Sequence, residues 1–305
     1  MIVSASYRSD IPAFYAEWFR NRFRAGHCRV VNPYGGGAYT VSLRDGVDGF
    51  VFWTRNAAPF RDALREVRDA GIPFVVQYTL TGYPHPLDPS VPDAQQALAT
   101  IRALAAEYGP RAVVWRYDPI VVTDLTPAGH HRVTFARLAE GLAGAVDEVV
   151  ISFASIYRKT ARNLGAAARR HGFAWADPEA GEKRALLTDL AGIAAAQGMA
   201  CTLCSQPDLL VAGVDGARCV DAARLSAVAG RPVAARPKGN RPGCLCHESR
   251  DIGDYDSCLH GCVYCYAVAG RAAARRRWQA HDPNGEFLIP PAQKSMQRPL
   301  RSQSS

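Results

Sequence analysis

The stretch Gly49-Phe-Val-Phe-Trp53 has the composition of a buried strand; a helical stretch follows over 59–70, and then a second strand, Phe74-Val-Val-Gln-Tyr-Thr79. Both strands are short, continuous apolar runs, as expected of parallel strands that are covered on both faces. Similar runs begin at residues 2, 112, 148 and 199, and most are followed by helical stretches, at 93–108, 130–145, 157–171 and 182–197. About six strand–helix units in regular alternation predict a parallel sheet with right-handed crossovers.

We therefore predict an α/β fold of the partial, TIM-like (β/α)6 barrel type, because six units fall short of the eight in a full barrel. A doubly wound open sheet is the alternative, although no G-x-G-x-x-G follows the first strand. The barrel would span 1–230. A Pro/Gly-rich connection at 230–243 then leads into a cysteine-rich, iron–sulfur-binding extension over 231–290, packed on the barrel mouth. The polar composition of 291–305 predicts a disordered tail.

The composition is that of an ordinary soluble globular protein, with 48% hydrophobic and 21% charged residues. No apolar run reaches the roughly 18 residues of a membrane helix, and the N-terminus lacks the basic region of a signal peptide. We expect a cytoplasmic protein with no membrane partner. Its nine cysteines would then be reduced, which favours metal binding over disulfides.

The positive charge is concentrated late in the chain. Of the net +8, residues 231–305 contribute most, with twelve Lys/Arg against six Asp/Glu. Arg275, Arg276 and Arg277, followed by Trp278, form the densest patch, and such a patch can bind nucleic acid phosphates. A basic helix face or a solubilising tail is the alternative interpretation.

Three cysteines, Cys258, Cys262 and Cys265, follow one another with the spacing C-x3-C-x2-C. A [4Fe–4S] cluster needs four ligands, and thiolate is its usual one, so three thiolates on a tight loop leave one iron open to a small molecule. The alternative is a structural zinc site, although zinc motifs more often contain paired C-x2-C units.

Four more cysteines could form a second metal site. Cys204 lies at the end of the last predicted strand and Cys219 before the last predicted helix of this region. Cys244 and Cys246 lie shortly before the first motif. Four thiols would complete a fully ligated cluster or a zinc site, unless they are only buried small hydrophobic side chains. Cys28 and Cys201 fit neither set, and we expect them to be structural.

Polar side chains recur where the predicted strands end, and in barrels of this class catalytic groups come from these ends. Arg55 and Arg116 could hold carboxylates or phosphates with a bidentate fork, and Asp118 could act as an acid or base. These three are our catalytic candidates; Ser6, Arg8 and Tyr264 are candidates for cofactor contact. The alternative roles are structural, with Asp10 as a helix N-cap and Asp118 as a turn former before Pro119. The full set of polar strand ends is Ser6, Arg8, Asp10, Thr54, Arg55, Asn56, Gln77, Thr79, Thr81, Arg116, Tyr117, Asp118, Ser152, Ser155, Ser205 and Gln206.

Four segments carry a resemblance to a known family: Met1 to Tyr15, Val51-Phe-Trp-Thr-Arg-Asn56, Trp115-Arg-Tyr-Asp-Pro-Ile120, and Asp251-Ile-Gly-Asp-Tyr-Asp-Ser-Cys258 through Tyr266. Together they resemble the bacterial domain-of-unknown-function family eighteen-forty-eight, over nearly the whole chain to about Ala267. That family is functionally uncharacterised, and its C-terminal cysteines are similar to those of radical S-adenosylmethionine (SAM) proteins, whose cores are partial barrels of six units.

The resemblance implies an enzyme in which the open iron of the cluster holds the amino and carboxylate groups of SAM, with Tyr264 as the aromatic of the loop. It also implies a one-electron donor such as a flavodoxin or ferredoxin. The substrate would be a small molecule or a modified biopolymer; a damaged nucleic acid, as in photoproduct lyases, is one alternative. Two features depart from the radical SAM pattern. The cysteine loop there usually follows the first strand, whereas here it follows the last unit, and no glycine-glycine-acidic motif follows the second strand.

Overall fold

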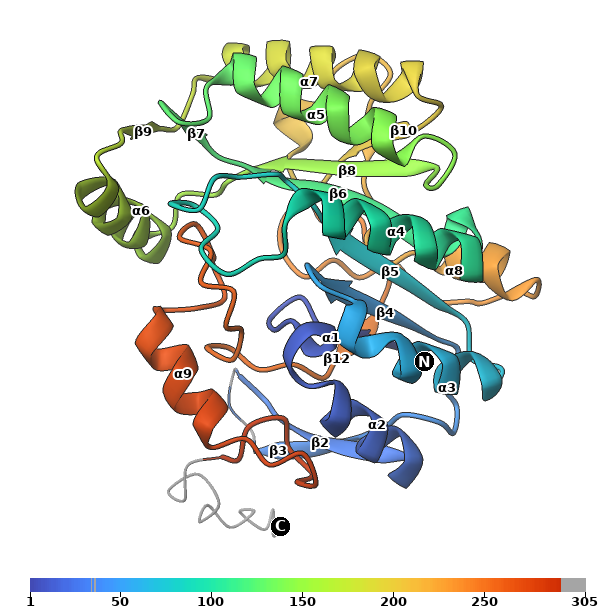
Figure 1. The fold of residues 1–305 in the computed structure, drawn as a ribbon. Helices are drawn as coiled ribbons and strands as arrows, with labels where there is room; N and C mark the ends of the chain where they lie inside the picture. Colours follow the sequence, from blue (N-terminus) through green and yellow to red (C-terminus); the bar gives the residue numbers. More distant parts are fainter. Residues whose placement is uncertain (34, 36, 292–305) are drawn as a thin grey trace, which may run out of the picture.

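An eight-stranded sheet forms the centre of the computed structural model, which describes residues 1–33, 35 and 37–291 (Figure 1). Its strand order is β11-β10-β8-β6-β5-β4-β1-β12, and every neighbouring pair is parallel. The strands are β1 (Ile2–Ala5), β4 (Gly49–Thr54), β5 (Phe74–Thr79), β6 (Val113–Ile120), β8 (Glu148–Phe153), β10 (Ala200–Leu203), β11 (Asp215–Gly216) and β12 (Ser249–Asp251). The six strands predicted from apolar runs are confirmed as β1, β4, β5, β6, β8 and β10.

The sheet is open rather than closed. Within the described residues, β11 and β12 are its two edges and do not pair with each other. Both edge strands are very short, two and three residues, so neither offers a ladder along which the sheet could close. The predicted α/β class with a parallel sheet is confirmed, whereas closure into a barrel is not observed.

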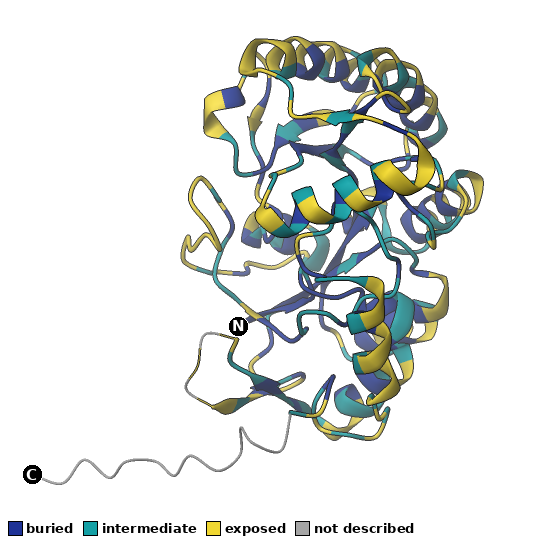
Figure 2. Cartoon of the chain, turned by 90° about the vertical axis from the view of Figure 1, so that its left-hand side faces the viewer, coloured by how far each residue is buried: buried dark blue, intermediate teal, exposed yellow. Residues whose placement is uncertain are grey.

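The two faces of the sheet have different covers. Alternate side chains such as Phe52, Trp115 and Ile151 belong to the large core that includes α2, α3, α4, α5 and α7. The intervening ones, such as Val51, Val114 and Val150, pack against α8 and against Cys219 and Cys246. Figure 2 shows the resulting pattern, with buried strands inside and exposed outer sides on the helices. The helices are α1 (Ile11–Phe14), α2 (Ala16–Ala25), α3 (Arg61–Asp69), α4 (Ala94–Tyr108), α5 (Ala128–Leu142), α6 (Arg158–His171), α7 (Ala180–Ala196), α8 (Ala222–Ala229) and α9 (Arg271–Gln279).

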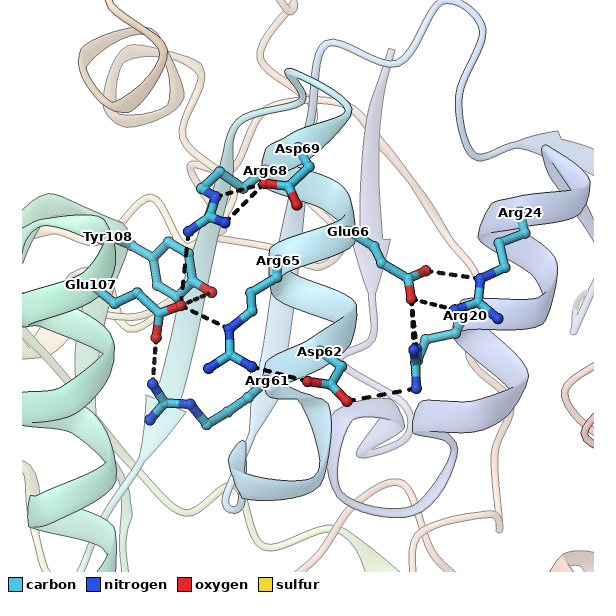
Figure 3. Close-up of polar contacts among 10 residues, drawn as sticks. All are labelled: Arg20, Arg24, Arg61, Asp62, Arg65, Glu66, Arg68, Asp69, Glu107 and Tyr108. Carbon is cyan, nitrogen blue, oxygen red and sulfur yellow. Dashed lines mark hydrogen bonds and ion pairs between the residues drawn. The ribbon is translucent and has the colours of Figure 1, made fainter.

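Ion pairs connect three of these helices along their solvent side (Figure 3). Glu66 on α3 pairs with Arg20 and Arg24 on α2, while Glu107 on α4 pairs with Arg61 and Arg65 on α3. Exposed pairs of this kind contribute about 0–1 kcal/mol each. They therefore fix the alignment of α2, α3 and α4 more than they stabilise the fold, which depends on the apolar core beneath them.

The region predicted as a separate extension contributes to the sheet itself. β12 pairs with β1 in parallel, from Ile2 opposite Ser249 to Ser4 opposite Asp251. Beyond α9, Trp18 on α2 donates from Nε1 to the carbonyl oxygen of Gly285 at 3.0 Å. The segment 231–291 thus contacts both strand β1, through β12, and helix α2, through Gly285. Most of the predicted disordered tail, 292–305, lies outside the described residues.

Two small antiparallel ladders complete the described structure. β2 (His27–Val31) pairs with β3 (Ala38–Ser42), and β7 (Val122–Thr123) pairs with β9 (Trp175–Ala176). No helix in the described part of the chain is both long enough and apolar enough to span a membrane.

Candidate functional site: a thiol-lined pocket

A pocket of about 620 Å³ lies at the carboxyl ends of the central strands. Ligand sites in parallel α/β sheets are found at this edge, because the strand ends present their loops there. The pocket brings together the ends of β1, β4, β5, β6, β8 and β10 with the late cysteine-rich segment. All seven cysteines of the two predicted sets line it: Cys204, Cys219, Cys244, Cys246, Cys258, Cys262 and Cys265.

The C-x3-C-x2-C loop forms one wall of the pocket. Each of its three thiols is half-buried, and Cys262 interacts electrostatically with both Cys258 and Cys265. His260, between the first two cysteines, holds the loop in place: its Nε2 lies 2.8 Å from Oδ2 of Asp10 and its Nδ1 lies 2.9 Å from the carbonyl oxygen of Ser90. The loop is therefore fixed against the end of β1 and against the turn that follows β5.

Arg55 connects this loop to the sheet. Its Nη1 donates to Sγ of Cys262 at 3.1 Å and to the hydroxyl of Tyr264 at 2.6 Å. Its Nη2 pairs with Asp88 at 2.7 Å and donates to Thr81 at 2.7 Å. Burial opposes the charge of the guanidinium, but the carboxylate of Asp88 raises the pKa of Arg55 well above its usual value. Arg55 thus places a permanent positive charge beside a cysteine of the loop.

Ser6 and Arg8, predicted to contact a cofactor, are held by Asp251 on β12. Arg8 pairs with Asp251 at 2.9 Å, and both side chains are about 95% buried. Ser6 donates from Oγ to Oδ1 of Asp251 at 2.7 Å. Both residues line the pocket, while these polar contacts also join β1 to the edge strand. Asp10, the suggested N-cap, does accept from the backbone N–H of Ala13 at 2.9 Å.

Arg116 and Asp118 line the same pocket at the end of β6. They form an ion pair with each other, and Ser152 donates to Asp118. Arg116 also donates from Nη1 to Sγ of Cys219 at 2.9 Å, and its guanidinium lies 4.9 Å from the ring centre of Trp53. The two predicted arginines therefore contact different thiols: Arg55 donates to Cys262, and Arg116 donates to Cys219.

The second cysteine set gathers around Cys219. Sγ of Cys219 lies 3.7 Å from Sγ of Cys204. Cys246 interacts with the thiols of both Cys219 and Cys244. A hydrogen bond with Cys246 is the main cause that lowers the pKa of Cys244 to about 6. The four thiols thus form a connected chain across the pocket wall.

Neither set is closed around a common centre. All nine cysteines are free thiols, and among the described residues no three His, Cys, Asp or Glu side chains are arranged so that they already could hold a metal ion. Burial raises the pKa of Cys258, Cys262 and Cys265, so all three favour the neutral thiol. A bound metal deprotonates its thiol ligands outright. The donor chemistry of the loop, three thiols beside a fixed guanidinium, fits an iron–sulfur cluster with three protein ligands.

Some predicted strand-end residues lie elsewhere. Gln77 bonds the carbonyl oxygen of Cys219, Tyr117 bonds His131, and Gln206 bonds the backbone of Phe153. Asn56, Thr81, Gln77, Tyr117 and Gln206 are not among the residues that line the pocket, whereas the other predicted strand ends are.

Several residues of the site carry no sequence signal that we used. Asp88 follows an irregular turn, and Asp251 and His260 become informative only when β12 is seen beside β1. Lys159 on α6 and Arg241 also line the pocket; Lys159 donates to the carbonyl oxygen of Tyr266 at 2.9 Å. Lys159 and Arg241 are far apart in sequence and form no pattern that could have identified them.

Fold and site together define an α/β protein with a parallel sheet and a thiol-lined pocket at the carboxyl ends of its strands. The sequence model of the family Domain of unknown function (DUF1848) matches residues 2–267, and the chain belongs to this family. No curated protein and no solved structure matches the chain.

Proposed function

We propose that this chain is an iron–sulfur enzyme of the radical SAM type, in which Cys258, Cys262 and Cys265 hold a [4Fe–4S] cluster. The observation that carries the proposal is the position of the loop. Its three thiols line one pocket together with the carboxyl ends of six parallel strands, and three thiolates leave one iron free for a small ligand. We take the open parallel sheet as the partial, TIM-like core that such enzymes have.

A reduced cluster of this kind supplies the electron for cleavage of SAM, and a flavodoxin or ferredoxin would deliver it. The residues of the chain would bind the cluster and the substrate and orient them toward each other. Arg55 offsets the negative charge of the loop thiolates through its contact with Cys262. Tyr264 bridges Arg55 and Asp88 and so fixes the loop, while Ser6 and Arg8 shape the pocket wall beside it. Arg116 and Asp118, which line the same pocket, would contact the substrate.

The test is anaerobic reconstitution of the full chain with iron and sulfide. We expect stoichiometric iron and acid-labile sulfide, and reductant-dependent release of methionine from SAM. The variant Cys258→Ala should lose both, whereas Cys28→Ala, which removes a buried thiol outside both sets, should keep both. A cluster that forms without SAM cleavage would refute the radical SAM mechanism. Zinc without iron would favour the alternative of a metal-binding module that is not an enzyme of this type.

A nucleic acid is a second candidate for the substrate of this enzyme. α6 carries five Lys/Arg and α9 four Arg, and neither helix contains Asp or Glu. α6 contacts the cysteine segment through Lys159 and through Arg162, whose Nη2 donates to the carbonyl oxygen of Ala269 at 2.6 Å. Salt-dependent DNA binding that is lost in Arg275→Ala/Arg276→Ala would support this substrate class. Binding that is absent, or that does not depend on salt, would remove it.

A further inference from the structure

We propose that Cys204, Cys219, Cys244 and Cys246 form a second metal site with four thiolate ligands, for a zinc ion or a fully ligated iron–sulfur cluster. This site is separate from the C-x3-C-x2-C loop and does not depend on the function proposed above. Four protein thiolates leave no open position on a tetrahedral metal, so the site would be structural or would transfer electrons, and would not bind substrate.

The first argument is convergence. Cys204 follows β10 directly, Cys219 lies between β11 and α8, and the other two belong to the late segment before β12. Three stretches that are separate in sequence therefore place thiols on one pocket wall. Sulfur atoms of Cys204 and Cys219 are 3.7 Å apart. Two thiolates bound to one tetrahedral zinc, each with a bond of about 2.3 Å, lie about 3.8 Å apart.

The second argument is how Cys244 and Cys246 are presented. The N–H of Cys244 donates to the carbonyl oxygen of Arg241 at 3.1 Å and closes a turn, and the N–H of Lys238 donates to the carbonyl oxygen of Cys246 at 2.9 Å beside the bridge of Pro237 with His247. This backbone brings the thiols of Cys244 and Cys246 into contact with each other. Leu245 between them is exposed.

A close backbone approach in the same loop supports this arrangement. A Cβ added to Gly239 would lie 2.3 Å from the carbonyl oxygen of Cys244 and 2.9 Å from its Cβ. Backbone cannot yield to such a clash without moving, so only glycine lets the loop fold tightly over Cys244. Glycine at 239 thus lets the loop pack directly against the backbone and Cβ of Cys244.

The third argument is the set of donors around the sulfurs. Arg116 donates to Cys219 at 2.9 Å, Arg241 donates to Cys204 at 3.7 Å, and the N–H of Val220 donates to Cys246 at 3.4 Å. Outer groups of this kind orient metal ligands and tune the metal. The two guanidinium groups also offset the net negative charge that four thiolates leave on a divalent metal.

The experiment compares metal content in three forms of the full chain, purified anaerobically. Iron, zinc and labile sulfide per chain are measured for the wild type, for Cys244→Ser/Cys246→Ser, and for Cys258→Ser/Cys262→Ser/Cys265→Ser. We expect the double variant to lose one zinc per chain, or the iron and sulfide of one cluster, and the triple variant to keep that same metal. Cys201→Ala, which removes a buried thiol of β10, the strand that directly precedes Cys204, is the matched control and should retain full metal content.

The two proposals fail separately. If metal is lost only in the triple variant, the four-thiolate site is wrong and the loop cluster is supported. If metal is lost only in the double variant, the loop cluster is wrong and the four-thiolate site is supported. Thiol alkylation of the wild type, which needs no variant to fold, gives an independent readout. We expect all four thiols to be protected together and to be released together by a chelator. Free alkylation of Cys244 before chelation would overturn the site.

Discussion

The buried ion pair of Arg55 and Asp88 is where a single substitution should have the largest effect on stability. Asp88 has no exposed side-chain surface and Arg55 has 12%. Asp88 accepts from Arg55 on both of its carboxylate oxygens and from the hydroxyl of Tyr264 at 2.7 Å. Asp88→Asn keeps the shape but removes the negative charge, and so leaves the guanidinium buried without a counterion.

Breaking one partner of a buried pair costs about 3–5 kcal/mol, because the remaining charge is not solvated. The entropy of unfolding near the midpoint is about 2.1 cal/mol/K per residue, and the chain has 305 residues. A loss of that size therefore lowers the unfolding temperature by about 5–8 °C. Solvent screens this pair little, since both side chains are far less than a third exposed.

Calorimetry on metal-free protein measures this shift without a contribution from cofactor loss. The matched control is Asp189→Asn, which breaks the pair of Arg132 and Asp189 at the same 2.7 Å but with side chains 44% and 45% exposed. Exposed pairs contribute about 0–1 kcal/mol, so the control should shift the midpoint by less than about 2 °C. If Asp88→Asn and Asp189→Asn lower the midpoint equally, the assignment of a dominant buried pair is wrong.

Three further outcomes follow from other parts of the structure. Gly253→Ala would place a Cβ 2.0 Å from Oγ of Ser6 and should cost about 1–3 kcal/mol in urea unfolding, whereas Gly192→Ala, in open space on α7, should gain about 0.5–1 kcal/mol; equal effects would contradict the packing. Burial lowers the pKa of His131 from 6.5 to about 4, so the unfolded chain binds the proton first and stability should fall by about 3 kcal/mol as pH drops from 6.5 to 4. His131→Asn should flatten that slope, and an unchanged slope would disprove the assignment. Tyr264→Phe removes contacts with Arg55 and Asp88 and should cost about 1–3 kcal/mol against no measurable cost for the half-exposed Tyr157→Phe.

The strands could be predicted from the sequence because each is a continuous apolar run, and burial on both faces imposes such a run. Gly49-Phe-Val-Phe-Trp and Phe74-Val-Val-Gln-Tyr are confirmed as β4 and β5 almost to the residue. β11 and β12 could not be predicted, since a strand of two or three residues has no periodicity. β11 pairs with β10 and β12 pairs with β1, but the two do not pair with each other, so the sheet is open. Local sequence does not encode which strands lie at the edges of the sheet.

The residues of the site also divide into those that could be predicted from the sequence and those that could not. That polar residues at strand ends share a pocket follows from parallel topology, and Ser6, Arg55, Arg116 and Asp118 do line it. Their partners could not be predicted, because Asp251 meets Arg8 across 243 positions of sequence. The roles predicted for the arginines stay predictions, since each is held by a carboxylate and also contacts a thiol.

β12 beside β1 changes how the late position of the cysteine loop is understood. From the β12 edge, the spatial order of the sheet is β12, β1, β4, β5, β6, β8, β10 and β11, so every later strand follows in sequence order. β12, the last strand of the described residues in sequence, is therefore the first strand in the spatial order of the sheet. The cysteine loop comes directly after it. In topological terms, the chain is a circular permutation of one that begins with 249–290. A loop that follows the last unit in sequence thus occupies the position of a loop that follows the first strand.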